Sequence, residues 1–172
     1  MPRISLPTLA QAITLVRSMS MQQKELLVDE IFKAQPNLLG SVAVLHRMGV
    51  SLVKVDFLLN ILLVCFMAMK GSGHTWPLIS LADQDQQMGR FSGSVKFGAD
   101  LAWHLQDIAN QQYIDAHAEK NLLAYVIGEC VGWLQSSPPE ESDKYVLLAA
   151  ISLTNCIAIQ TTKVTTHKRK KT

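Results

Sequence analysis

The stretch that decides the fold is VDFLLNILLVCFMAM, residues 55–69, which is apolar throughout except for Asp56 and Asn60. A membrane-spanning helix needs about 20 predominantly apolar residues, whereas this run has about 15 and carries a carboxylate near one end. A charged side chain in the middle of a bilayer costs at least about 2.5 kcal/mol. We therefore interpret the run as the core helix of a soluble protein, with a membrane span as the alternative.

A second apolar run, YVLLAAISLTNCIAI, covers residues 145–159 and is followed closely by the basic sequence HKRKK. This order resembles the layout of a C-terminal membrane anchor. The run is also short for a span, and it contains Ser152, Thr154 and Asn155. We expect a second core helix here, and tail anchoring is the alternative.

Signals that start and stop helices are frequent along the chain, and strand signals are nearly absent. The clearest are the prolines at 7 and 36, a capping box at Ser20 and Gln23, a glycine stop at Gly49, and an N-cap at Ser80. A helix that is apolar on nearly every face is surrounded by others. The pattern predicts an all-α, single-domain bundle of about eight helices, packed around two nearly fully apolar helices at about 52–70 and 143–160.

The charges divide the chain into a mildly acidic body, residues 1–161, and a basic tail, residues 162–172. The tail has five basic residues and no acid: Lys163, Lys168, Arg169, Lys170 and Lys171. We expect the last helix to end near Gln160 and the tail to be disordered, because it is too polar to fold alone. Such a tail can make weak, salt-sensitive contacts with nucleic acid or an anionic surface. A purely solubilising role is the alternative.

Only 17% of the residues are charged, against roughly 25% in typical soluble chains. We therefore expect that many residues face either the protein core or a binding partner. The three cysteines, Cys65, Cys130 and Cys156, stand far apart in apolar surroundings. They indicate buried free thiols in a reducing compartment. We find no signal-peptide pattern and expect a cytoplasmic protein.

One helical face carries the most suggestive chemistry, with Asp100, His104 and Asp107 at positions i, i+4 and i+7. A histidine between two carboxylates could act as a general base or a metal ligand. No second His or Cys stands nearby at ligand spacing, so we favour a solvated face with an N-cap.

The segment IDAHAE places Asp115, His117 and Glu119 in an expected turn, where alternate spacing could gather them around a cation. The alternative is that these residues are there because Asp and His are common at helix ends. No phosphate-binding loop, nucleophile elbow or CxxC motif is present in the sequence. We therefore expect a protein that is not an enzyme and has no metal or other cofactor.

Polar residues inside the two apolar helices form short stripes. Asp56 and Asn60 share one face of the first helix, and Ser152 and Asn155 share one face of the second. An unpartnered buried polar group costs roughly 1–3 kcal/mol. One hypothesis is that the stripes face each other and fix the register of the pair; the other is that each bonds separately to a backbone carbonyl or water.

Small residues recur every four positions at Ala124, Gly128, Gly132 and Ser136, which we call the small-residue ridge. Two glycines inside a helix cost about 1 kcal/mol each relative to alanine. Close helix packing would compensate for that cost. We expect this helix to contact one of the apolar helices, or alternatively to form a homo-oligomer interface through the ridge.

The loop KGSGHTWPL, residues 70–78, is the predicted partner-binding region, through Lys70, His74 and Trp76. Tryptophan is over-represented among interface hot spots. Alternatively, Trp76 folds back over the end of the first apolar helix. The sequence favours a helical regulator, inhibitor or adaptor that acts by protein–protein contact. The alternative is a nucleic-acid-associated protein that uses the basic tail, and an enzyme centred on His104 comes third.

Overall fold

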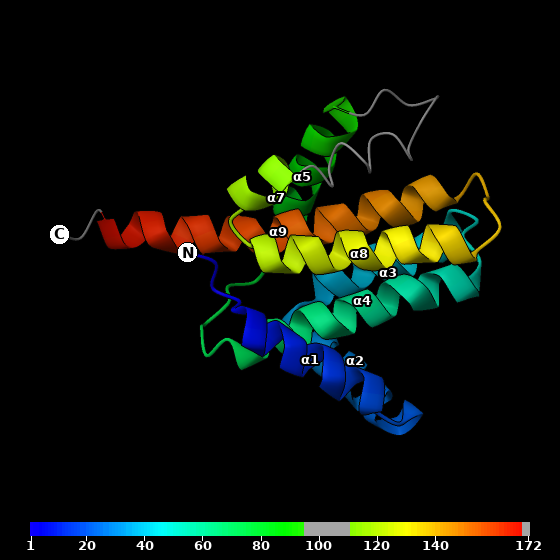
Figure 1. Ribbon diagram of the computed structural model, residues 1–172, viewed down its shortest axis with the longest axis horizontal. Coiled ribbons are helices and arrows are strands. Elements are labelled where there is room, and N and C mark those ends of the chain that lie inside the picture. Colours follow the sequence, from blue (N-terminus) through cyan, green and yellow to red (C-terminus); the bar gives the residue numbers. More distant parts are fainter. Residues whose placement is uncertain (95–110, 170–172) are drawn as a thin grey trace.

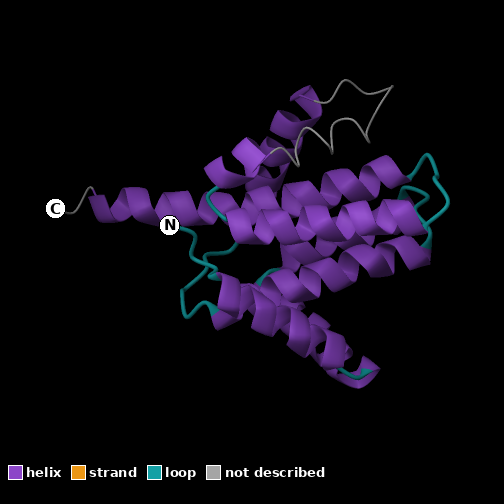
Figure 2. Cartoon of the chain, viewed as in Figure 1, coloured by secondary structure: helices purple, strands orange, loops and turns teal. Residues whose placement is uncertain are grey.

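The computed structural model describes the backbone of residues 1–94 and 111–169 and the side chains of 1–89 and 114–160. These ranges contain α-helices and no strand, so the all-α prediction is confirmed (Figure 2). The eight described helices are α1 (Leu6–Ser18), α2 (Met21–Ala34), α3 (Pro36–Arg47), α4 (Leu52–Gly71), α5 (Leu81–Ser94), α7 (Gln111–Ala116), α8 (Lys120–Ser136) and α9 (Asp143–Arg169).

Helix α4, which contains the opening stretch, is the centre of the bundle. It packs against α1, α2, α3, α8 and α9, and it runs beside α9 in the same direction (Figure 1). Within the described residues, α4 is the one helix long and apolar enough to cross a membrane by length and composition, and 56% of its apolar window is buried inside the protein. The core helix of a soluble protein meets the same description. Helices α4 and α9, which correspond to the two expected apolar helices, lie side by side.

Local sequence signals account for the ends of several helices. Ser20 and Gln23 form the expected capping box at the start of α2, and Ser80 and Asp83 exchange the same pair of hydrogen bonds at the start of α5. The stop at Gly49 is also confirmed, because its φ of 87° lies in the left-handed region that glycine adopts without strain. The amide of Val50 then donates to the carbonyl of Leu45, which closes a Schellman motif after α3.

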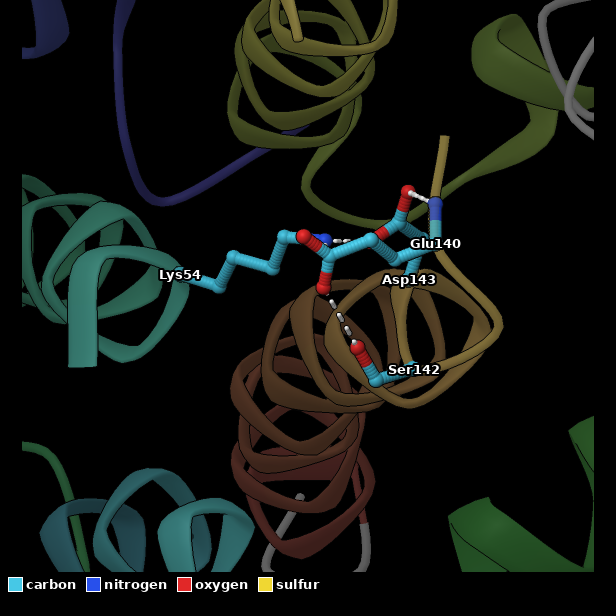
Figure 3. A network of polar contacts seen from close by, with 4 residues as sticks. All are labelled: Lys54, Glu140, Ser142 and Asp143. Carbon is cyan, nitrogen blue, oxygen red and sulfur yellow. Dashed lines mark hydrogen bonds and ion pairs between the residues drawn. The ribbon is translucent and has the colours of Figure 1, made fainter. Parts of the chain in front are cut away.

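A buried ion pair joins the first turns of α4 and α9 (Figure 3). The ammonium of Lys54 contacts the carboxylate of Asp143 and lies 2.7 Å from Glu140 Oε2. Burial alone would lower the pKa of Lys54, but the hydrogen bonds to Asp143 and Glu140 outweigh it and raise that pKa above its usual value. Beside the pair, the rings of Phe57 and Trp133 stack with centroids 4.7 Å apart. Lys54 therefore stays charged and ties the two central helices together.

The N-terminal residues are fastened across the bundle by Glu119, which is fully buried at the start of α8. Its two carboxylate oxygens accept from the backbone amides of Arg3 and Ile4, at 3.0 and 3.1 Å. Asn121 donates to the carbonyl of Ile4, whose side chain is also fully buried. Charged oxygens with amide donors make stronger hydrogen bonds than neutral ones, so this segment is an integral part of the fold.

The last helix is longer than expected. Helix α9 continues to Arg169 instead of ending near Gln160, and its final part projects beyond the rest of the bundle (Figure 1). Helical backbone in water needs no tertiary contact once a long helix has been nucleated, because each added residue gains one further hydrogen bond. The prediction that the chain leaves the helix near residue 160 is therefore wrong.

The two polar stripes do not face each other, so the register hypothesis is wrong. The side-chain amide of Asn60 donates to the carbonyl of Asp56, and its oxygen accepts from Lys24 Nζ at 2.7 Å. Asn155 Oδ1 lies 3.2 Å from His117 Nε2 on another side of the bundle. Asn60 and Asn155 are therefore bonded separately, Asn60 to a backbone carbonyl and to Lys24, and Asn155 to His117.

Helix α8 packs against the apolar helices α9 and α4, as expected, but its small-residue ridge points away from the core. All four of its residues are exposed, and a Cβ added at Gly128 or Gly132 would meet no atom within 4 Å. The helix instead buries its larger apolar face, including Leu122, Val126 and Cys130. Burying these side chains removes more apolar area from water than burying glycines would.

Candidate binding groove

An apolar groove of about 690 Å³ lies between α3, α5 and α9. Each helix contributes one stripe at helical spacing, so the groove follows the helix axes. The α3 stripe is Pro36, Asn37, Gly40, Ser41, Val44, Leu45 and Met48. The α9 stripe is Tyr145, Leu148, Ala149, Ser152, Leu153 and Cys156. Leu81, Gln84, Asp85 and Met88 of α5 form the third wall.

The groove has a closed floor and an apolar rim. Its floor consists of side chains that are at least 90% buried in the core, among them Leu45, Leu148, Leu153 and Cys156. The rim exposes large apolar side chains to solvent: Val44 (45%), Met48 (49%), Leu81 (63%) and Met88 (37%). Contiguous exposed apolar surface with this arrangement marks binding sites more often than scattered single residues do.

The polar side chains around the groove are mostly engaged in holding its walls. Asn37 donates to the carbonyl of Ile79, Gln84 donates to the carbonyl of Asn37, and Ser41 donates back to its own helix. These bonds fix α5 against the start of α3. The remaining charged group is the exposed carboxylate of Asp85 on α5. These hydrogen bonds therefore hold the walls of the groove in place. The lining suits an apolar ligand better than the substrate of a chemical reaction.

The three thiols are free, buried side chains. Burial raises the pKa of Cys65 and of Cys130 to about 12, because the thiolate would lose its hydration. Cys156 lines the floor of the groove, with Sγ 3.9 Å from the carbonyl of Asp83. The thiolate is the reactive form, so Cys65 and Cys130 are inert at neutral pH.

The three residues of the predicted partner-binding loop, Lys70, His74 and Trp76, are not among those that line the groove. The indole of Trp76 folds back on the end of α4, donating to the carbonyl of Met69 at 2.9 Å, and the guanidinium of Arg3 lies 4.4 Å above its ring. Lys70 pairs with Glu30, and His74 is exposed. The alternative position for the tryptophan is thus the observed one, while partner binding by this loop stays a prediction.

The other predicted residues lie partly outside the part of the chain that the structure describes. Asp100, His104 and Asp107 lie outside the described residues, as do Lys170 and Lys171. The backbone of Lys163, Lys168 and Arg169 belongs to the projecting part of α9. In the part of the chain that the structure describes, no group of three or more His, Cys, Asp or Glu side chains is arranged to hold a metal ion. His117 and Glu119 instead bond to each other and to neighbouring segments.

Sequence reasoning missed the groove because its walls come from three helices far apart in the chain. One signal was present: α3 shows both an inner and an outer apolar side, since Leu45 is buried while Val44 and Met48 are exposed. A helix with apolar residues on two faces needs a second packing or binding partner in addition to the core. Which other helices complete the site depends on the tertiary arrangement.

Comparison with known proteins adds no relative: no protein-family model, no curated protein and no solved structure matches this chain.

Proposed function

We propose that this is a helical binding protein that acts by protein–protein contact, as a regulator, inhibitor or adaptor, and that the groove between α3, α5 and α9 receives an amphipathic helix of its partner. The observation that carries the proposal is the apolar rim of Val44, Met48, Leu81 and Met88 above a closed apolar floor. Helix-in-groove recognition uses such a surface, on which an apolar row of the partner occupies a preformed trough.

Two features support a protein partner over a small molecule. The groove is open along one side, whereas pockets for small ligands bury most of the ligand's surface. Two of its rim residues, Met48 and Met88, are flexible and polarisable, and methionine-rich surfaces adapt to partner side chains. The described side chains around the groove form no catalytic constellation, so binding is the activity that this geometry favours.

The test compares two double variants of the full chain in an affinity purification from the native cell, read by mass spectrometry. Val44→Glu/Met48→Glu places two charges on the groove rim at positions that are 45% and 49% exposed. The matched control, Leu15→Glu/Met21→Glu, adds the same charge at exposed apolar positions of α1 and α2. A partner retained by the wild type and the control but lost from the rim variant supports the proposal. Equal retention by all three forms contradicts it.

A second candidate function rests on the end of α9. Lys163, Lys168 and Arg169 lie on a helical segment that projects beyond the bundle (Figure 1). A projecting basic helix suits electrostatic contact with nucleic acid. Binding of duplex DNA or RNA by the full chain, lost with rising salt and absent from a chain ending at Thr162, would favour this function. If the truncated chain still binds, the tail is not required for nucleic-acid binding.

A further inference from the structure

The charge on the groove is of one sign. Among the lining residues whose side chains the structure describes, Asp85 is the one charged residue and none is a cation. Its carboxylate is exposed and makes no ion pair or hydrogen bond within the described side chains. The neighbouring acid, Asp83, differs because its carboxylate accepts from the amide of Ser80 and from Gln160. With respect to the described side chains, Asp85 therefore offers a negative charge without an ion-pair partner beside an apolar trough.

The dimensions of the trough match a short helix. Its α9 wall runs from Tyr145 to Cys156, which at 1.5 Å per residue is about 17 Å. Three turns of a partner helix have this length, enough for apolar anchors at i, i+4, i+7 and i+11. The volume of about 690 Å³ is also large enough for several aliphatic side chains.

The sign of the charge discriminates among apolar occupants. A fatty acid or an anionic lipid would bring a negative headgroup toward Asp85 and would find no lysine or arginine among the described side chains of the groove walls to receive it. Like charges brought together at a partly desolvated rim repel each other. A helix with a lysine or arginine beside its apolar row has the opposite effect, because its cation pairs with the carboxylate while its apolar row fills the trough.

Building on the proposed helix-binding function, we propose that the partner segment is a basic amphipathic helix, with an apolar row about three turns long and a lysine or arginine that pairs with Asp85. The apolar row supplies most of the affinity, and the ion pair selects the partner and sets its orientation. The pair is at the exposed edge of the groove, so salt weakens the selection more than it weakens the apolar contact.

The probes are two fluorescently labelled helical peptides of about 18 residues, with identical leucine rows and either lysines or glutamates beside them. Their binding to the full chain is measured by fluorescence anisotropy at low salt. The wild type is expected to bind the lysine peptide about tenfold more tightly than the glutamate peptide. Asp85→Lys should reverse this order, whereas the control Asp29→Lys, an exposed acid on α2, should leave it unchanged.

The outcomes separate the two proposals. If both peptides bind the wild type equally, or if Asp85→Lys keeps the preference for lysine, the basic-helix inference is overturned; the groove function stands provided that Val44→Glu/Met48→Glu abolishes binding. Displacement of the lysine peptide by oleate, a fatty-acid anion, would overturn the inference in favour of a lipid ligand. If neither peptide binds the wild type, or if the rim variant binds as well as the wild type, both proposals fail.

Discussion

The buried ion pair between α4 and α9 predicts an unequal response to two conservative substitutions. Lys54 is bonded to two acids whose surroundings differ, since the side chain of Asp143 is 10% exposed and that of Glu140 is 54% exposed. Asp143→Asn keeps the shape but directs an uncharged amide at a buried ammonium. Breaking a buried pair by removing one charge costs about 3–5 kcal/mol, and the loss should lie near the lower end of that range because Glu140 still pairs with Lys54. Glu140→Gln removes a solvated charge and should cost about 0–1 kcal/mol.

The free energy of unfolding is measured by urea denaturation, followed by far-ultraviolet circular dichroism and by tryptophan fluorescence. Domains of this size are stable by about 5–15 kcal/mol, so the Asp143 variant should lose a large share of its stability. The denaturant slopes should stay equal, which shows that the compactness of both states is unchanged.

A double-mutant cycle isolates the charge effect from the helix cap, because Asp143 also accepts from the amide of Glu140 at 2.9 Å. In a Lys54→Met background no buried ammonium loses a carboxylate partner, so Asp143→Asn should cost at least about 2 kcal/mol less than in the wild type. Equal costs in the two backgrounds, or equal losses for the Asp143 and Glu140 variants, would refute the reasoning.

Further predictions concern the thiols, the N-terminal segment, the ridge and the tryptophan of the loop. Because burial raises the pKa of Cys65 and Cys130 to about 12 from about 8.5 in an unfolded chain, the unfolded state loses these protons first. The thiol contribution to the free energy of unfolding should therefore be constant below about pH 8.5 and fall above it by about 1.4 kcal/mol per pH unit for each thiol. Urea titrations at several pH values test this with a variant in which both cysteines are replaced by alanine. If its free energy of unfolding falls with alkaline pH as steeply as that of the wild type, the prediction is contradicted. Glu119→Gln should cost about 1–3 kcal/mol and speed hydrogen exchange at the amides of residues 3 and 4, because a neutral amide oxygen replaces a carboxylate that holds both; unchanged exchange would count against it. Gly128→Ala should raise the melting temperature, with a gain of about 0.5–1 kcal/mol, since an added methyl meets no atom within 4 Å; a loss would indicate that another chain packs there. Trp76→Phe should cost about 0.5–1.5 kcal/mol in denaturant titrations, because the indole donor to the Met69 carbonyl is lost while Ser72 still donates to that carbonyl, and no change would show that the bond contributes nothing.

The parts of the fold that follow from local interactions could be predicted from the sequence. The capping box of Ser20 and Gln23 and the glycine stop at Gly49 are each decided within a few residues. The central position of α4 also follows locally, because a helix that is apolar on nearly every face has to be covered by others. These signals were sufficient for the fold class and for most of the helix boundaries.

The candidate site could not be predicted, because it depends on which helices meet. Val44 of α3 and Met88 of α5 border the same trough only after both helices have packed on α9. The ion pair of Lys54 was also missed, although a lone lysine near the start of one apolar helix and Asp143 at the start of the other were a usable signal. Recognising it requires knowing that the two helices run in the same direction, so that both starts lie at one end of the bundle (Figure 1).

The same limit explains the errors. For the ridge of α8, spacing identified four small residues on one face but not the side on which that face lies. The larger apolar residues decided the orientation, and Gly128 was left in solvent. For the polar stripes, the bonding capacity of Asn60 and Asn155 was correctly seen as requiring partners, but the partners, Lys24 and His117, come from segments far away in sequence.

The central claim is that the groove between α3, α5 and α9 is the binding surface, and site-specific photocrosslinking in the native cell tests it most directly. A photoreactive amino acid replaces Met48 on the rim in one form of the full chain and Gly132 on the exposed face of α8 in the other. The account predicts that the rim position crosslinks to one defined segment of a partner, with apolar residues at helical spacing and a neighbouring lysine or arginine, and that the α8 position does not. Crosslinks to the same partner segment from α8 and none from the rim would contradict the account.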